Sequence, residues 1–361
     1  MSWSFRLVRV LGTDVKVHVT FLLVLAAFFF HAQAQAGAAA AFATAGLFLG
    51  LFLCVLLHEF GHILMARRFG IRTPSVLLLP IGGVAMLERM PEEPRQELLI
   101  ALAGPAVTLA IAAVLSLVLT LTGDPPNWIQ LDMDSPAVVV RLFSMNVMLL
   151  AFNLIPAFPM DGGRVLRALL AMRIDYVRAT RIAATLGQAA AILGAVAAIT
   201  MYRWEWGLIA LFIFFTAGQE ATFVATRAAG RGIIVDQMMV TRFVTVPVHA
   251  TLRVAADTLL DTEQRELPVV DNLGNVEGLL TRDHLVRGLA ARGPDSSVAE
   301  AMARPVPLLP LGLSFDDAVQ RLRASGYPAL PVVDGGGRMV GLLTSDNITD
   351  LIMLRQAVGT R

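Results

Sequence analysis

Residues 41–66 form an apolar run that is long enough to cross a bilayer, yet it contains His58, Glu59 and His62. Histidines four positions apart lie on one face of a helix, so both can reach one metal ion, and the glutamate between them can act on water there. Ionisable groups are costly at membrane depth and mark functional sites. We therefore predict a zinc site rather than two unrelated helix histidines, with His58 and His62 as ligands and Glu59 as the catalytic group.

The composition of the 361 residues is that of a membrane protein. Hydrophobic residues make up 56% and charged residues 16%, whereas a soluble domain is about 25% charged. Six apolar stretches approach the roughly 20 residues that a membrane-spanning helix needs: 17–30, 41–66, 97–121, 137–156, 182–202 and 206–226. The net charge of +1 gives no reason to expect a nucleic-acid partner. The single cysteine, Cys54, excludes an intrachain disulfide and is expected to be a small buried hydrophobic residue of no assigned role.

Arginines are concentrated in the loops on one side of these stretches. They are Arg67, Arg68, Arg164, Arg167, Arg173, Arg178, Arg181, Arg227 and Arg231. Of the opposite loops, 33–40 and 122–136 contain neither Lys nor Arg, and the last contains Arg203 alone. The positive-inside rule then predicts a multi-pass cell-membrane protein with both termini in the cytoplasm and His58 near the cytoplasmic face. Residues 1–36 also fit a cleaved signal peptide, but we favour a retained first span because several further spans follow.

The fourth apolar stretch ends at a segment that proline residues break. Pro156 and Pro159 interrupt the helix, and a diglycine follows Asp161. Asp161 is therefore expected on irregular backbone at membrane depth, which is tolerated only beside protein or a water-filled site. Two histidines and one carboxylate form a known catalytic zinc set, so we predict Asp161 as the third ligand rather than a helix-capping loop residue. Asn153 is expected either to orient a substrate carbonyl or to satisfy broken helix backbone.

Residues 76–87 are apolar, but they are too short and too broken by Pro80, Gly82 and Gly83 to span the membrane. They fit a re-entrant hairpin whose edge strand could pair with an extended substrate, and they also fit a plain hydrophobic turn. The next stretch opens with Gly104 and Pro105, which we interpret as a site of close helix packing.

One structural unit occurs twice in the last third of the chain. Three blocks recur at a constant offset of 63 residues: 235–239 and 298–302, 267–271 and 330–334, 278–283 and 341–346. A constant offset across three blocks indicates a duplicated unit. Each copy is predicted to contain a helix, two short strands and a second helix, with the helices at 252–262, 284–292, 315–325 and 348–355.

Three separated motifs together resemble the signature of the site-2 proteases, a family of polytopic intramembrane zinc metalloproteases. They are the His58–His62 pattern in an apolar run, Gly104–Pro105 in the next run, and the segment from Asn153 to Asp161. The duplicated unit resembles a tandem pair of CBS domains. The combination is similar to the sporulation-protease branch of the family, and the resemblance covers nearly the whole chain.

The resemblance implies hydrolysis of peptide bonds in membrane-embedded protein substrates. One zinc ion per chain would be held by His58, His62 and Asp161, with Glu59 as general base. Gly82 and Gly83 would belong to a re-entrant β element near the substrate, and Asn153 would help to hold that substrate.

The CBS resemblance implies a regulatory module that binds adenine nucleotides and forms homodimers. The candidate nucleotide-binding residues are Thr281, Asp283, Thr344 and Asp346. Nucleotide-binding CBS units commonly carry Asp three residues after the Ser or Thr, whereas this chain has His284 and Asn347 there. A structural or dimerising module without nucleotide is the alternative.

The expected architecture is a six-span α-helical membrane domain with a re-entrant β element (residues 1–230), followed by an α/β CBS pair (233–292 and 296–355). A CBS-regulated transporter or metal channel that uses the histidine pair as a cation site is the main alternative function. It has no need for a glutamate beside the histidines, and the spans contain no inverted repeat. A catalytically inactive scaffold is the second alternative, and the intact His, Glu and Asp set argues against it.

Overall fold

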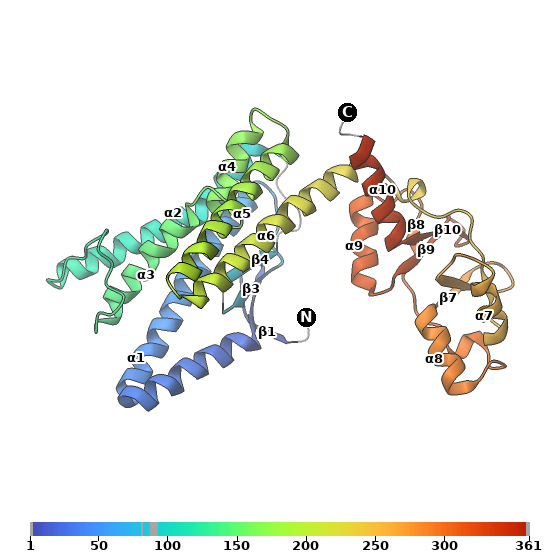
Figure 1. Cartoon of the computed structure of the whole chain (residues 1–361), viewed down its shortest axis with the longest axis horizontal. Helices are drawn as coiled ribbons and strands as arrows, with labels where there is room; N and C mark the ends of the chain where they lie inside the picture. The colour runs from blue at the N-terminus through green and yellow to red at the C-terminus, as the bar shows by residue number, and fades with distance from the viewer. Residues whose placement is uncertain (1–2, 81, 87–92, 359–361) are drawn as a thin grey trace. The chain divides into compact units, whose positions relative to one another are not determined.

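The computed structural model describes residues 3–80, 82–86 and 93–358 of the chain (Figure 1). The chain divides into two compact units, residues 1–224 and 225–361. The boundary falls inside helix α6 (Trp204–Ala229), so a single helix ends the first unit and begins the second.

Long apolar helices dominate the first unit, which confirms a helical membrane protein. Helix α1 (Val19–Arg68) has 50 residues and breaks at Gly37, whose φ of +82° is not helical. Its two arms, drawn in blue in Figure 1, contain the first two predicted spans. The unit also contains α2 (Pro94–Leu121), α3 (Val138–Asn153), α4 (Asp161–Ala171) and α5 (Tyr176–Thr200). Among the described residues, α1, α2, α5 and α6 are long and apolar enough to cross a membrane, and α3 is apolar but only 16 residues long.

A four-stranded sheet packs against α1. Its order is β1 (Ser4–Val10), β2 (Thr13–His18), β3 (Ser75–Leu79) and β4 (Gly82–Met86). Strand β2 runs parallel to β3, and β3 and β4 form the antiparallel hairpin expected near residues 76–87, of which residues 81 and 87 lie outside the described part. The first two strands were not predicted. They form because Val15 and Val17 alternate with polar residues and are buried in a core with Phe21 and Phe52.

The second unit contains two small three-stranded sheets, one per sequence repeat. The first is built from β5 (Val246–Pro247), β6 (Glu266–Val270) and β7 (Val276–Thr281). The second is built from β8 (Leu309–Pro310), β9 (Ala329–Val333) and β10 (Met339–Thr344). The four predicted helices are confirmed with small shifts at their ends, as α7 (Leu252–Leu260), α8 (Arg282–Arg292), α9 (Phe315–Ser325) and α10 (Ser345–Val358).

The two repeats exchange their first segments. Ile233, Val235 and Met238 at the start of the first repeat are buried in the core that contains Phe315 and Leu330 of the second. Val298 and Met302 at the start of the second repeat are buried in the core that contains Leu252 and Leu267 of the first. Each core is therefore completed by residues from the other repeat, and packing crosses the boundaries read from the sequence.

Candidate functional site

The three predicted ligand side chains meet in one place. His58 Nε2 and His62 Nε2 lie 3.1 Å apart. Asp161 Oδ2 lies 3.1 Å from His58 Nε2 and 3.2 Å from His62 Nε2. Both histidines are buried, and these atoms form the cluster that could hold a metal ion. The ligand atoms thus form a nearly equilateral triangle although Asp161 lies 99 residues beyond His62.

Helix α2 orients both imidazole rings from their outer nitrogens. His58 Nδ1 is hydrogen-bonded to Thr108 Oγ1 at 2.8 Å, and His62 Nδ1 donates to the carbonyl oxygen of Ile100 at 2.7 Å. A proton held on Nδ1 leaves the Nε2 lone pair free for a metal, and such outer partners fix the ring orientation. Neither Thr108 nor Ile100 could be predicted from the sequence, because one is an ordinary helix hydroxyl and the other contributes only its backbone carbonyl.

Gly104 of α2 lies directly against the ligand nitrogens. A Cβ atom at this position would be 2.8 Å from His58 Nε2 and would overlap His62 Nε2. Gly104 was predicted as a helix-packing residue. The structure gives it a more specific role, because the missing side chain leaves the room that the two rings occupy.

Asp161 is brought to the histidines by the break between α3 and α4. Helix α3 ends at Asn153, which is partly buried, and Asp161 is the first residue of α4. A Cβ atom on Gly163 would come within 2.5 Å of Ala157 C, and one on Gly162 would overlap Ile155 O. The diglycine therefore lets α4 start tightly against residues 155–158, which fixes the position of Asp161.

Glu59 lies beside this triangle, next in sequence to His58. Strand β4 covers its side chain, because a Cβ atom on Gly83 would lie 2.6 Å from Glu59 Cγ. Gly82 has a φ of +137°, a backbone conformation that favours glycine, and the space around its Cα is open. The hairpin thus brings backbone, rather than a side chain, up to the glutamate.

The donor set fits zinc. Ligands bonded at about 2.0–2.1 Å in a tetrahedral site are about 3.3 Å apart, close to the 3.1–3.2 Å edges of this triangle. Three protein ligands leave a fourth position, as in catalytic rather than structural zinc sites.

The same helical unit contains a charged group that we call the Arg167 cluster: the buried Arg167 and Glu97, and the partly buried Glu220. The Arg167 side chain is 1% exposed. Its Nε donates to Glu97 Oε1 at 2.7 Å, and its Nη1 donates to Glu220 Oε1 at 2.7 Å. The sequence analysis counted Arg167 among the arginines of a cytoplasmic loop, and the structure buries its side chain within the helical unit.

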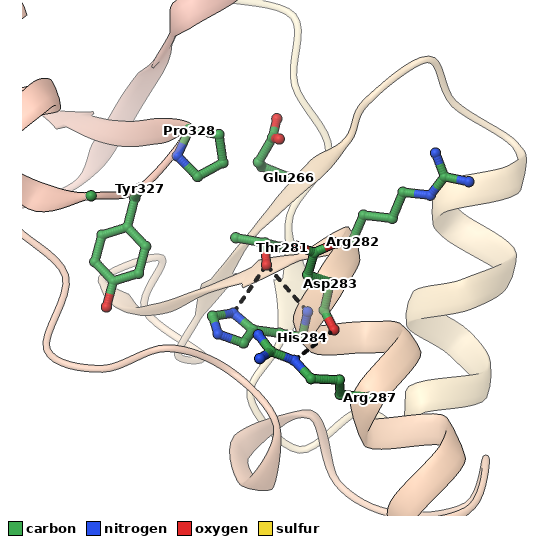
Figure 2. A pocket seen from close by; sticks show the side chains of 9 residues that line it. Glu266, Thr281, Arg282, Asp283, His284, Arg287, Tyr327 and Pro328 are labelled. Atoms are coloured by element: carbon green, nitrogen blue, oxygen red, sulfur yellow. Dashed lines mark hydrogen bonds between the residues drawn. The ribbon is translucent and has the colours of Figure 1, made fainter.

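In the second unit, the first repeat contributes most of a polar cleft of about 320 Å³ (Figure 2). Thr281 and Asp283, both predicted nucleotide-binding residues, line it together with Glu266, Arg282, His284, Arg287, Gly326, Tyr327 and Pro328. Thr281 Oγ1 caps α8 by accepting from the His284 backbone N–H at 3.2 Å, and it also lies 3.1 Å from His284 Nδ1. Burial, together with the charge of Asp346, raises the pKa of Glu266.

The other two predicted nucleotide-binding residues lie outside this cleft. Thr344 accepts from the Asn347 backbone N–H at 3.1 Å and caps α10 in the same manner. Asp346 is exposed and forms a 3.5 Å ion pair with Arg265. Equivalent positions of the two repeats therefore lie in different surroundings. Thr281 and Asp283 line the cleft, whereas Thr344 and Asp346 do not.

Comparison with known protein families supports both parts of this description. The family model described as Peptidase family M50 matches residues 46–131 and 128–194. The CBS domain model matches residues 235–291 and 298–354, in agreement with the duplicated unit.

Full-length relatives are similar over both units. A zinc metalloprotease of Methanocaldococcus jannaschii is 31% identical over 349 residues, which cover 96% of each chain. Rip3 of Mycobacterium tuberculosis, also described as a zinc metalloprotease, is 29% identical over 98% of this chain and 93% of that protein. The solved site-2 protease of M. jannaschii is 36% identical, covers 61% of this chain and 95% of that one, and has a TM-score of 0.47.

Proposed function

The chain belongs to Peptidase family M50, the site-2 proteases, and from that premise we propose that His58, His62 and Asp161 hold one catalytic zinc ion per chain with Glu59 as the general base. It is a zinc metalloprotease of membrane substrates that carries a CBS pair. The transporter alternative gains no support, because the relatives matched over nearly their full length are metalloproteases.

The triangle of ligand atoms beside Glu59 carries the assignment. Zinc bound there would supply a Lewis acid that acidifies water and polarises the scissile carbonyl. The Glu59 carboxylate then takes a proton from the attacking water and passes it to the nitrogen of the leaving amine, so one water is consumed per peptide bond. Burial of both histidines keeps competing water away from the ligands.

The substrate would be bound in an extended form. A helix engages its carbonyl groups in its own hydrogen bonds, so a membrane-embedded substrate must unwind before cleavage. Strand β4 is the edge of its sheet and lies against Glu59 through Gly83. Addition of the substrate to this edge would bring its carbonyls to the site by backbone hydrogen bonding. Asn153, at the end of α3, would help to hold the substrate.

Six membrane spans are the arrangement that best fits the helices: the two arms of α1, then α2, α3, α5 and α6. Arg67 and Arg68 in the last turn of α1 favour a cytoplasmic position for the metal site, both termini and the CBS pair. The first arm is retained in this proposal, because Val15, Val17 and Phe21 share a core with Phe52 of the second arm.

The cleft in the CBS pair would bind an adenine nucleotide. Arg282 and Arg287 offer cationic groups for phosphate, and Tyr327 offers a face for stacking with a base. Occupancy of this cleft would be the cytosolic signal that regulates proteolysis. Titration of AMP and ATP into the full-length protein tests this assignment, and the absence of a binding isotherm for either nucleotide would leave a purely structural module.

The decisive experiment on catalysis is Glu59→Gln in the full-length protein. We expect this variant to retain zinc, measured by elemental analysis, and to lose cleavage, measured by proteomics of membrane fragments in cells with wild-type or variant protein. His62→Ala is the matched variant that should lose both zinc and cleavage. Wild-type fragment levels from Glu59→Gln would overturn the assignment.

A further inference from the structure

Arg167 makes every one of its described polar contacts inside the protein. Glu97 of α2 and Glu220 of α6 accept from its guanidinium, and a second ion-pair contact joins Nη2 to Glu97 Oε1. The guanidinium carbon lies 4.8 Å from the ring centre of Phe158 and 5.0 Å from that of Tyr176. The cluster therefore joins α4 to α2, to α6, to the first residue of α5 and to the segment that precedes α4.

Three of these segments, α4, α2 and the segment before α4, are also tied to the proposed zinc ligands. Arg167 lies six residues, about 9 Å along the axis, beyond Asp161 on the same helix. Glu97 lies one turn before Ile100, whose carbonyl accepts from His62 Nδ1. Phe158 precedes Asp161 by three residues. The Arg167 cluster thus links the helix that carries one ligand to the helix that orients another.

Stability alone does not explain why Arg167 and Glu97 are buried as charges at this point, with the partly buried Glu220 beside them. Replacing a buried ion group by well-packed neutral side chains is often neutral or stabilising, so the best-attested benefit of such a group is a defined register between elements. A register error of about 1 Å between α4 and α2 would distort a ligand triangle whose edges are 3.1–3.2 Å.

We propose that Arg167, held by Glu97 and Glu220, is a positioning residue that sets α4 against α2 and thereby keeps Asp161 at zinc-binding distance from His58 and His62. The inference rests on the zinc site proposed above. Its effect is on metal retention, because none of the three residues touches the ligand atoms. Loss of a group that hydrogen-bonds a metal ligand typically weakens metal affinity 10- to 100-fold, so a cluster that acts only through the helices should have an effect at the lower end, about tenfold.

The test is a zinc-release measurement on full-length, zinc-loaded protein in lipid nanodiscs. Excess chelator is added, and the zinc that remains is followed by elemental analysis. The triple variant R167M/E97Q/E220Q removes all three charges together, so no single buried charge is left unpaired. We expect it to release zinc about tenfold faster than wild type. The zinc-free triple variant should have a Tm close to that of zinc-free wild type. If the cluster served only the stability of the fold, the variant would melt at a lower temperature even without zinc.

Three further variants keep the result interpretable. R167K retains the charge but not the forked donor geometry, so it should release zinc several-fold faster even if the triple variant fails to fold. R173M removes an exposed arginine just beyond α4 and should match wild type. Wild-type release from R167K or from a folded triple variant overturns the inference. H62A separates the two claims, because retention of zinc by H62A would instead defeat the zinc site itself.

Discussion

Gly83 of β4 lies against the side chain of Glu59, so close that a Cβ atom on the glycine would be 2.6 Å from Glu59 Cγ and 3.1 Å from Glu59 Oε1. The hairpin and the proposed general base therefore form one site, although they lie 24 residues apart. A change in the hairpin should affect catalysis before it affects metal binding.

Gly83→Ala tests this relationship. Adding one methyl group against Glu59 should displace the carboxylate and lower kcat about tenfold or more, because a correctly placed general base contributes about 10²–10⁴-fold to the rate. Zinc content should stay at the wild-type level, since the ligand triangle does not contact Gly83. Gly46→Ala in α1 is the control, because its Cβ would meet open space and activity should be unchanged. Full activity of Gly83→Ala would show that β4 is displaced during catalysis.

Gly104→Ala should differ from Gly83→Ala, because it should lower the zinc content. Its Cβ would overlap His62 Nε2 and lie 2.8 Å from His58 Nε2, so the rings must move and zinc should be lost. Elemental analysis of the purified protein measures this directly. Gly50→Ala is the matched control, because its Cβ would make an ordinary 3.4 Å contact with Leu142. Stoichiometric zinc in Gly104→Ala would mean that the nitrogens do not face the metal as proposed.

The two capping threonines of the CBS pair allow stability and ligand binding to be separated. Thr281→Ala and Thr344→Ala each remove a helix N-cap, so each should cost about 1 kcal/mol of unfolding free energy. Of the two, Thr281 lines the cleft. Calorimetric titration with AMP should therefore show at least tenfold weaker binding for Thr281→Ala and unchanged binding for Thr344→Ala. Equal losses of affinity would place the nucleotide elsewhere in the second unit.

Glu266 should make the stability of the CBS pair depend on pH. Burial and Asp346 raise its pKa in the folded protein above the ordinary 4.5, so the folded state favours the protonated carboxyl. The associated stability is complete below pH 4.5 and is lost as pH rises through the raised pKa. Glu266→Gln should therefore stabilise the folded CBS pair at pH 7, seen as a higher Tm of its transition. The gain in unfolding free energy should be less than about 1 kcal/mol, because the side chain is only half buried.

The same substitution should have little effect near pH 4, where Glu266 is protonated in both states. Glu277→Gln, which removes an exposed carboxylate of β7, is the control for general charge effects. A stabilisation by Glu266→Gln that is the same at both pH values would point to packing rather than to proton binding.

The convergence of the three proposed metal ligands could be predicted because each residue carries a local signal. His58 and His62 are four residues apart on a helix, and Asp161 follows two prolines that break a helix. The groups that orient them could not, because Thr108 and the Ile100 carbonyl act only through the packing of α2 on α1. That packing is a tertiary property with no pattern in the sequence around either residue.

Two other features were misread for different physical reasons. The alternation of Val15 and Val17 with Lys16 is a strand signal, but the nearby basic residues and the apolar run after it favoured a simple membrane anchor. Arg167 lies between arginines that fit the positive-inside rule, and nothing in the composition distinguishes it from them. Its burial depends on Glu97 and Glu220, which lie 70 and 53 residues away.

Because the CBS repeats exchange their first segments, a single repeat separated from the other would lack part of its core. A fragment that ends near residue 292 would lack Val298 and Met302, and a fragment that begins near residue 296 would lack Ile233, Val235 and Met238. Either piece would expose an unfilled apolar cavity to solvent. Although the sequence records a duplication, the pair can be transplanted only whole, and it must include the residues that directly follow α6.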